Sequence, residues 1–373
     1  MKIAAISTSR VPSLTANSIQ VMKTCNALVK NGYEVHLWVP GNPPENWDKL
    51  VNHYGLDTSF TIHRKQSYPF LKRYDFSWLT LLAARRQKCD LVYTWLPQTA
   101  VLALLFGLPT ILEMHDMPTG HIGPLLFRMF IKSKGRKRLI TITDALRQKL
   151  ENRFGMSLRS PVTLIAPNGT DPEHYANLPP AWQARDELGL PQIPTAVYTG
   201  HFYAGRGMDL MFALAKKSPD IHFLWVGGTP QSVLEWQERL ASSGIKNVTL
   251  TGFVENRRLP LYQSAGDILL MPFENMISGS SGGNSAEICS PMKMFDYLAC
   301  GRAILASDLP VLHEVLNEGN AVFCPIGDIS SWEAALKDLI TNPKRCSNLG
   351  DQAKLDSTNY SWVSRAKRAL EGL

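Results

Sequence analysis

The sequence lacks a hydrophobic run long enough to cross a bilayer. Its longest apolar stretch, Thr99–Met114, is interrupted by Gly107 and Pro109, which indicate a helix followed by a strand. The apolar residues at the N-terminus give way to STSR at positions 7–10 before they could form the core of a secretory signal. We therefore expect a cytoplasmic protein without a transmembrane helix.

Cysteine is scarce, with six residues among 373, and no two of them form a CxxC pair. This spacing indicates reduced thiols rather than a disulfide framework or a zinc site. The sequence also lacks a DxD triplet and any cluster of His, Cys, Asp and Glu with the spacing of metal ligands. We predict that the protein requires no metal and no cofactor.

Glycine is missing where a dinucleotide-binding protein would need it. The first strand-like segment, KIAAIS, runs directly into STSRVPS, so a GxGxxG phosphate cradle is absent. A nicotinamide-dependent dehydrogenase is therefore a weak alternative. A solute-binding protein is disfavoured too, because such a protein would normally carry an export signal.

Positive charge is concentrated in the first part of the chain, whose formal net charge as a whole is +7. Residues 1–172 contain 22 Lys and Arg against 11 Asp and Glu, or +11, and the remaining residues contain 17 against 21, or −4. Such asymmetry favours an anionic partner for the first part.

Strand-like and helix-like segments alternate from the first residue, pause at a Pro-, Asn- and Gly-rich stretch over 166–182, and then resume. This alternation predicts an α/β protein with two doubly wound parallel sheets and a ligand cleft between them. The expected parts are residues 1–172, residues 173–355 and a C-terminal helical segment over 356–373. The expected strands lie in KIAAIS, YEVHLWV, DLVYTW, TILEM, LITIT and VTLIA, and then in TAVYTG, IHFLWVGG, NVTLTG, DILLMPF, RAILAS and AVFCP.

The segment CSPMKMFDYLACG, Cys289–Gly301, predicts a short helix with an anion site at its start. Ser290 is a suitable N-cap, Pro291 suits the first helical position, and Gly301 suits the stop. Met292, Phe295 and Ala299 would face the core, while Lys293, Asp296 and Cys300 lie on another side. Free N–H groups and a lysine in the first turn suit a diphosphate, and a carboxylate about 9 Å further along could accept bonds from a ribose. A plain surface helix with an i,i+3 Lys/Asp pair is the alternative.

A second anion-compatible loop, TGHFYAGRGMDLM, follows the first strand of the second domain. Gly200, Gly205 and Gly207 permit close backbone approach, and His201 and Arg206 supply positive charge. Two such loops opening helices of one domain can grip one diphosphate. Together they favour the functional interpretation of the first segment.

With these motifs in place, the chain resembles the retaining, GT-B-fold glycosyltransferases known as group 1 or family 4. The resemblance covers essentially the whole chain and implies two Rossmann-like domains with a C-terminal helix that returns to the first. The matching segments are ITITDALRQKL, IAPNGTDPEHY, YTGHFYAGRGMDL, SPMKMFDYLACGRAILASDLPVLHEVL and YSWVSRAKRAL.

The resemblance implies roles for individual residues. His115, Arg206 and Lys293 would act in catalysis, His115 by bonding a sugar hydroxyl and the two cations by stabilising the leaving diphosphate. The backbone at Phe253 and Val254 would hold the nucleobase, and Asp296 the ribose. The remaining donor-binding residues would be Gly200, His201, Ser290, Pro291 and Met292, and the acceptor side would include Asn17, Ser18 and Asp116.

Several positions depart from the family pattern. The glutamate expected eight residues before Asp296 is replaced by Ile288, and only the neighbouring Glu287 is acidic. The loop GSSGGNSAE at 279–287 is expected to order on donor binding. The implied reaction is a front-face transfer of a hexose from a UDP-sugar, with a GDP-sugar next in preference, to a hydroxyl of a cell-surface glycan, lipid-linked saccharide or glycolipid. A GT-B-fold sugar-nucleotide epimerase and an inert nucleotide-sugar-binding paralogue remain as alternatives.

The segment HIGPLLFRMFIKSKGRKR at 121–138 combines an apolar stretch with a basic end. It could lie on an anionic membrane surface as an amphipathic helix, on the inner face of the plasma membrane, or face the core with a solvated end. Nucleic acid is not expected as a partner, because aromatic residues do not alternate with the basic ones.

Overall fold

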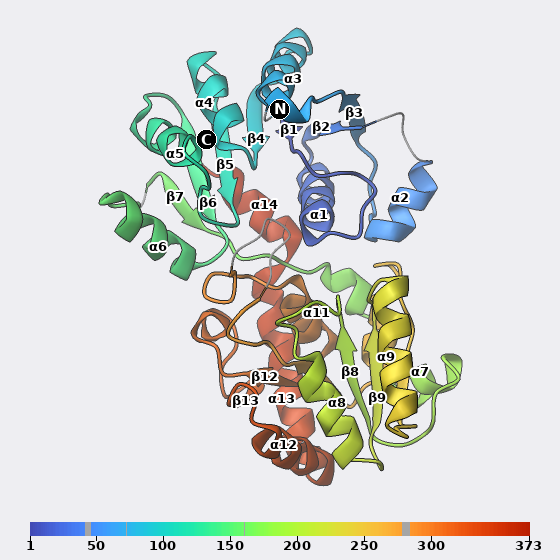
Figure 1. Ribbon diagram of the computed structural model, residues 1–373. Coiled ribbons are helices and arrows are strands. Elements are labelled where there is room, and N and C mark those ends of the chain that lie inside the picture. Colours follow the sequence, from blue (N-terminus) through green and yellow to red (C-terminus); the bar gives the residue numbers. More distant parts are fainter. Residues whose placement is uncertain (42–45, 72, 160, 278–283) are drawn as a thin grey trace. The chain divides into compact units, whose positions relative to one another are not determined.

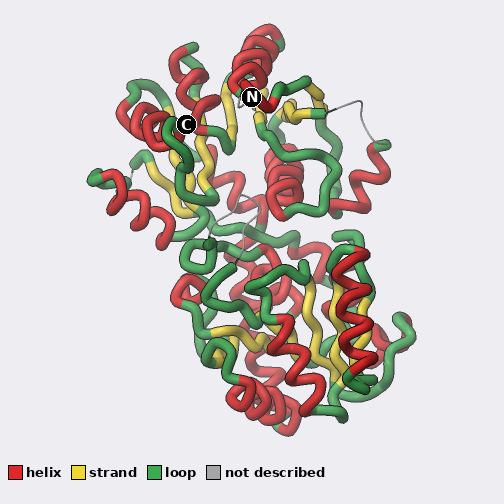
Figure 2. Tube along the Cα trace, viewed as in Figure 1, coloured by secondary structure: helices red, strands yellow, loops and turns green. Residues whose placement is uncertain are grey.

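A computed structural model describes residues 1–41, 46–71, 73–159, 161–277 and 284–373 (Figure 1). Within these ranges the chain forms two compact units. The first comprises Met1–Asn168 together with Trp362–Leu373, and the second comprises Gly169–Ser361. In both units strands alternate with helices, as Figure 2 shows. Across the described ranges, no helix combines the length and the apolar character needed to cross a membrane.

The first unit contains a seven-stranded parallel sheet in the order β3-β2-β1-β4-β5-β6-β7. The strand β3 was not expected from the sequence, because its residues TIHRK are mostly polar and partly exposed, as befits an edge strand. The strands are β1 (Lys2–Ile6), β2 (Glu34–Pro40), β3 (Thr61–Lys65), β4 (Leu91–Thr94), β5 (Thr110–Met114), β6 (Lys137–Thr141) and β7 (Thr163–Ile165).

Except for the last one, the helices of the first unit connect successive parallel strands. Side chains cap the N-termini of several of these helices. Thr15 caps the first helix, and Thr143 caps the helix after β6. The helices are α1 (Ala16–Lys30), α2 (Trp47–Tyr54), α3 (Tyr74–Arg86), α4 (Pro97–Leu105), α5 (Gly123–Lys132), α6 (Asp144–Phe154) and α14 (Trp362–Leu370).

Helix α14 belongs to the first unit although it comes last in the chain. It packs beside α1, where the Asn31 side chain donates a hydrogen bond to the Val363 carbonyl at 2.9 Å. The Arg138 guanidinium donates to the carbonyls of Arg368, Ala369 and Glu371 at 2.6–3.0 Å, which satisfies the end of the helix. The helical segment expected from residue 356 therefore starts later, at Trp362, after a 3₁₀ turn.

The second unit contains a six-stranded parallel sheet in the order β10-β9-β8-β11-β12-β13, built from all six segments expected there. Its strands are β8 (Thr195–Thr199), β9 (His222–Val226), β10 (Val248–Leu250), β11 (Ile268–Met271), β12 (Ala303–Ser307) and β13 (Ala321–Cys324). Its helices are α7 (Ala181–Glu187), α8 (Met208–Lys217), α9 (Pro230–Ser242), α10 (Leu259–Ser264), α11 (Met292–Cys300), α12 (Ile329–Thr341) and α13 (Pro343–Ser357).

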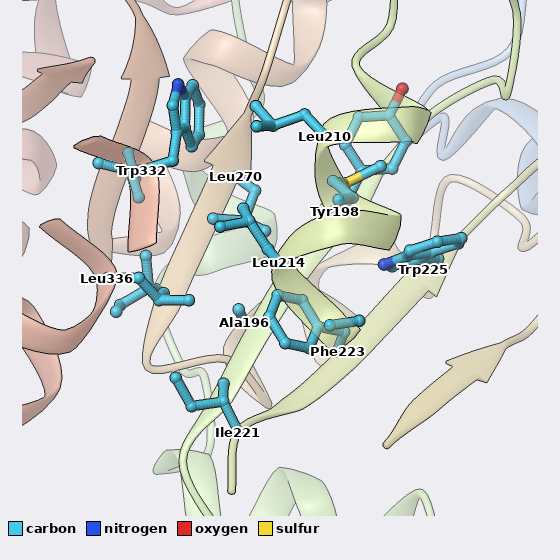
Figure 3. Packing of buried hydrophobic residues seen from close by; sticks show 14 of the residues in the cluster. Ala196, Tyr198, Leu210, Leu214, Ile221, Phe223, Trp225, Leu270, Trp332 and Leu336 are labelled. Carbon is cyan, nitrogen blue, oxygen red and sulfur yellow. The ribbon is translucent and has the colours of Figure 1, made fainter. Parts of the chain in front are cut away.

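A core of large side chains joins this sheet to its helices (Figure 3). Tyr198 and Trp225 extend from adjacent strands and are fully buried, as is Trp332 of α12. Burial of each such apolar side chain contributes about 1.5–3 kcal/mol. The carboxyl ends of β8 and β11 lead directly into Gly200 and Pro272, so this packed core fixes the loops that carry the candidate site.

Candidate functional site

Helix α11 contains the segment that the sequence identifies as a diphosphate site. The predicted cap was Ser290, but Pro291 occupies the N-cap in an extended conformation, and the first helical residue is Met292. Ser290 is therefore one residue too early to cap the helix, and it is buried instead. Gly301 ends the helix in the left-handed region at φ 69°, as expected. Since no side chain of the described residues caps the first turn, its N–H groups are suited to an anion.

The buried face of α11 is wider than predicted. Met292 was expected in the core but is only half-buried, and Cys300 was expected on the open side but is buried. The reason is that α11 packs against α10 and α13. The buried residues are Met294, Phe295, Tyr297, Leu298, Ala299 and Cys300.

Lys293 lies in the first turn of α11, and its ammonium has no polar partner among the residues that the structure describes. Its Nζ is buried and makes no hydrogen bond or ion pair within the described residues. It lies 3.7 Å from the centroid of the Tyr198 ring and 5.3 Å from that of Phe273, so aromatic faces are its nearest favourable contacts. The pKa of Lys293 is well below its ordinary value. Burial is the larger cause, and the positive charge of Arg206 is the smaller one.

Arg206 supplies a second cation beside the same aromatic ring. Its guanidinium carbon lies 5.1 Å from the centroid of Phe273, and its buried Nε has no hydrogen-bond partner within the described residues. The flanking Gly205 and Gly207 have φ of 85° and 72°, and a Cβ on either would lie 1.9 Å from a backbone oxygen. Only glycine fits at these two positions, so the loop can pack closely against the backbone at Met276 and Pro272.

The loop between β8 and α8 brings its backbone to the Lys293 ammonium. A Cβ on Gly200 would lie 2.9 Å from Lys293 Nζ, which places this glycine directly beside the charge. The Tyr198 hydroxyl donates a hydrogen bond to the His201 carbonyl at 2.7 Å. The His201 ring stacks on Tyr203 with centroids 4.6 Å apart. The structure thus brings Gly200, Arg206 and Lys293 together, as the sequence predicts.

The residues predicted to contact the ribose and the base also belong to the second unit. Asp296 is half-buried, and its Oδ1 accepts a hydrogen bond from the Thr170 hydroxyl at 2.9 Å. The Phe253 side chain is 41% exposed, and Val254 is half-buried. Ile288 is buried at 2% exposure, whereas Glu287 is exposed. Residues 279–283 of the loop expected to order on donor binding lie outside the described residues.

In the first unit, His115 is bound to a buried carboxylate that the sequence analysis did not assign. His115 Nε2 lies 2.6 Å from Glu113 Oε1, and the Glu113 side chain is fully buried at the end of β5. Arg365 of α14 contacts both oxygens of Glu113, at 2.7 and 3.2 Å. Burial alone would raise the pKa of Glu113, but the Arg365 and His115 contacts hold it well below its ordinary range.

The three acceptor-side residues have different surroundings. Asn17 is exposed, and Asp116 is half-buried with its Oδ1 accepting a bond from the Met117 N–H at 2.7 Å. Ser18 is fully buried; its hydroxyl lies 2.5 Å from the Tyr54 hydroxyl and donates to the Arg10 carbonyl at 2.9 Å. These contacts tie Ser18 to the loop before α1 and to α2, and its acceptor-side role stays a prediction.

In the segment 121–138 the apolar side chains divide between the core and the surface. Phe127 and Phe130 of α5 are buried in the core, while Leu125 and Met129 are 57% and 42% exposed. At the end of the segment Lys137 donates to three carbonyls near the end of α5 and Arg138 to α14, so these two cations are structural. The remaining cations, Arg128, Lys132, Lys134 and Arg136, are exposed.

A surface pocket of about 460 Å³ lies at the opposite edge of the second sheet, where β8, β11 and β12 begin. Its lining includes Arg185, which is paired with Asp267 at 2.9 Å. None of the predicted donor residues lines this pocket, so it is separate from the candidate site. Among the described residues, no group of three His, Cys, Asp or Glu side chains is arranged to hold a metal ion.

Comparison with solved structures identifies this architecture as a GT-B fold. A glycosyltransferase from Rickettsia africae matches with a TM-score of 0.77 at 12% identity, over 99% of this chain and 97% of that one. Sucrose-phosphate synthase from Thermosynechococcus elongatus matches with a TM-score of 0.75 at 17% identity, over 98% and 96%. The Anabaena protein HepE in complex with UDP matches with a TM-score of 0.73 at 16% identity, over 100% and 99%.

Two family models match the sequence: Glycosyltransferase Family 4 over residues 18–174, and Glycosyl transferases group 1 over residues 194–342. The chain therefore belongs to the group 1, or family 4, glycosyltransferases. It is similar to the alpha-galactosylglucosyldiacylglycerol synthase of Streptococcus pneumoniae, with 26% identity over 54% of this chain and 52% of the relative. The D-inositol 3-phosphate glycosyltransferase of Kineococcus radiotolerans shows 23% identity over 63% and 56%. The chain spans about half the length of these curated relatives.

Proposed function

We propose that the second unit binds the diphosphate of a nucleotide-sugar donor. The observation that carries this proposal is the pair of cations, Lys293 and Arg206, beside the ring of Phe273 without a carboxylate partner in the described residues. A buried charge without a partner is costly, so its retention favours an anionic ligand that supplies the missing partner. The open first turn of α11 and the Gly200 backbone would complete the phosphate cradle.

The nucleotide proposed is UDP, with GDP as the second choice. HepE, which shares the fold, is described in complex with UDP. Asp296 would accept hydrogen bonds from the ribose hydroxyls. The backbone at Phe253 and Val254 would contact the base. These assignments extend the family pattern to matching positions of this chain.

The reaction proposed is transfer of a hexose with retention of anomeric configuration. The bond between the anomeric carbon and the diphosphate oxygen breaks, and the acceptor oxygen bonds to the same face of that carbon. The acceptor proton passes to the leaving phosphate, so no protein nucleophile takes part. Arg206 and Lys293 stabilise the negative charge that develops on the diphosphate, and His115 bonds a sugar hydroxyl.

The acceptor proposed is a hydroxyl of a glycan or glycolipid at an anionic membrane surface. Ile122, Leu125 and Met129 follow one another at i, i+3 and i+7 and are 45%, 57% and 42% exposed. No acidic residue occurs from Met117 to Thr143, so nothing in this stretch offsets the exposed cations of α5 and the loop that follows. Such a surface suits anionic headgroups. The pneumococcal relative is named for a glycolipid product, which agrees with this class.

A thermal-shift screen against UDP, GDP, their sugar conjugates and uridine tests the donor proposal. Ligand at 100 times its Kd adds about 2.7 kcal/mol of apparent stability, so a bound nucleotide should raise Tm by several degrees. UDP should do so and uridine should not, because the proposed site grips the diphosphate. A shift with uridine equal to that with UDP would overturn the proposed diphosphate site.

Incubation with donor alone distinguishes a transferase from the two alternative functions. An epimerase would convert the sugar, and an inert paralogue would bind the donor without transfer or hydrolysis.

A further inference from the structure

Glu113 stands at the centre of a buried polar cluster that connects four elements of the first unit. Its carboxylate receives five side-chain contacts, although a carboxylate offers only about four lone-pair sites. Those on Oε1 come from Gln20 of α1 at 2.6 Å, His115 at 2.6 Å and Arg365 of α14 at 2.7 Å. Those on Oε2 come from Tyr93 of β4 and from Arg365 at 3.2 Å. The carboxylate is saturated and rigidly held.

The protonation of this cluster determines which nitrogen of His115 carries hydrogen. Arg365 and His115 together keep the pKa of Glu113 low despite its burial, so the carboxylate is ionised and can only accept hydrogen bonds. Tyr93 is buried and its pKa is raised well above its ordinary value, so its hydroxyl keeps its proton and donates. Nε2 of His115, facing an acceptor, must therefore be the protonated nitrogen.

When Nε2 carries the hydrogen, Nδ1 of the neutral ring has a free lone pair. Nδ1 makes no hydrogen bond within the part of the chain that the structure describes. The His115 side chain remains 22% exposed, in contrast to Glu113 and Arg365, which are 0% and 3% exposed. His115 is thus the accessible member of this cluster. Its Nδ1 is available as a hydrogen-bond acceptor, while its Nε2–H donates to Glu113.

We propose that Glu113 and Arg365 are positioning residues that lock His115 in the Nε2–H form, so that Nδ1 accepts a hydrogen bond from a hydroxyl of the donor sugar or the acceptor. This inference rests on the role proposed for His115. The proposal gives helix α14 a role in the reaction. Arg365 of α14 holds the Glu113 carboxylate in place, and this carboxylate in turn orients the His115 ring. Arg365 also donates to the Ala166 and Pro167 carbonyls, which sets the position of its own guanidinium.

The direct test is the tautomer itself, measured by two-bond ¹H–¹⁵N NMR of protein labelled at histidine. The His115 signal is assigned by its loss in His115→Gln. In the unliganded protein with a neutral ring, we expect the pattern of a protonated Nε2 and a bare Nδ1. In Glu113→Gln we expect a mixture of tautomers. A bare Nε2 in the wild type, or an unchanged pattern in Glu113→Gln, would overturn the inference regardless of activity.

A double-mutant cycle gives the kinetic test. If Glu113 acts through His115, Glu113→Gln and His115→Ala should each lower kcat at unchanged UDP affinity, and Glu113→Gln/His115→Ala should be no slower than His115→Ala alone. Multiplicative losses would indicate that Glu113 does not act through His115. A full rate for His115→Ala would instead refute the role proposed for His115 while leaving the tautomer result intact.

Loss of stability is controlled in two ways. Asp267→Asn breaks the Arg185–Asp267 pair of the second unit, and it should lower Tm without changing kcat at a temperature where the protein is folded. Should Glu113→Gln fail to fold, Glu113→Gln/Arg365→Gln replaces the charged pair by two amides. This variant should lose the Nε2–H preference, and its retention would contradict the inference equally.

Discussion

The Lys293 ammonium lies 3.7 Å from the centroid of the Tyr198 ring and has no anionic partner within the described residues. The nearby Arg206 has the same sign of charge and contacts the same neighbour, Phe273. Aromatic faces contribute about 0.5–2 kcal/mol to a cation, which is less than the cost of burying it. The unliganded site is therefore electrostatically incomplete, and a diphosphate would complete it.

Replacement of Lys293 by methionine should separate stability from binding. Lys293→Met removes a buried charge at similar length, so we expect the free energy of unfolding to rise by about 1–3 kcal/mol while the UDP-induced increase in Tm disappears. The folded-state pKa is below the unfolded value of 10.5, so the gain should be full at low pH and shrink as pH rises toward 10.5. Denaturant unfolding at several pH values measures this. A variant that is less stable and still binds UDP would contradict the site.

Binding of UDP should draw a proton onto Lys293. The depressed pKa leaves part of the lysine neutral at alkaline pH, and an adjacent diphosphate favours the charged form, so the pKa rises on binding. Calorimetry at about pH 8.5, where a terminal phosphate is fully ionised, should show uptake of up to one proton when buffers of different ionisation enthalpy are compared. Lys293→Met should show none, and equal uptake in the variant would exclude Lys293 as its source.

Arg206→Gln should reduce turnover strongly. Loss of one preorganised group that stabilises developing negative charge typically costs about 100- to 1,000-fold in kcat. Arg239→Gln is a matched control, because Arg239 also lies over aromatic rings in the second unit, 4.5 Å from Phe212, but pairs with Asp209 at 2.6 Å. Steady-state kinetics should show a normal kcat for the control, and similar rates in the two variants would remove Arg206 from the mechanism.

The Glu113–Arg365 pair should dominate the acid sensitivity of the first unit. Glu113→Leu leaves an unpaired buried guanidinium, so we expect a loss of about 3–5 kcal/mol, whereas Glu113→Leu/Arg365→Met should recover much of it. The folded pKa of Glu113 is lowered, so its stabilising contribution is present above the ordinary value of 4.5 and is lost as pH falls below it. Urea unfolding from pH 3 to pH 7 should show the gap between wild type and the double variant narrowing on the acid side.

The exposed face of α5 and the loop that follows it should bind anionic vesicles. Lys132→Glu/Lys134→Glu should weaken co-sedimentation with phosphatidylglycerol vesicles, because each basic residue near such a surface contributes about 1 kcal/mol. Lys216→Glu/Lys344→Glu changes the same net charge on exposed residues of the second unit and should leave binding intact. Binding that is independent of anionic lipid, or equally weakened by both variants, would exclude this surface.

Most of the fold can be predicted from the sequence. Buried parallel strands appear in it as short apolar runs, separated by segments with the periodicity of a helix. The strand β3 escapes this rule, since an edge strand such as TIHRK needs no apolar face. The cap of α11 was misplaced because Ser-Pro fits two positions, and only the backbone conformation of Pro291 distinguishes them.

Some residues of the candidate site could be predicted from the sequence, and others could not. Gly200, Arg206 and Lys293 could be predicted as parts of an anion site, because a loop that leads into a helix is marked in the sequence by nearby glycines, prolines and cations. Tyr198 and Phe273, which hold the cations, were not identified, since they resemble ordinary core residues of a strand end. Thr170 and Arg365 are 126 and 252 residues from the carboxylates they contact. Contacts this distant leave no local pattern, although a single glutamate within the apolar strand TILEM was a signal that could have been followed.

The return of α14 to the first unit determines the order in which the chain can finish folding. Residues 169–361 emerge from the ribosome before Trp362–Leu370, so the first unit waits for the whole second unit before Arg365 reaches Glu113. At synthesis rates of about 5–20 residues per second this interval lasts roughly 10–40 s. Throughout it the carboxylate of Glu113 lacks its guanidinium, and the nascent first unit is incomplete. Biosynthesis thus makes the first unit the last to mature.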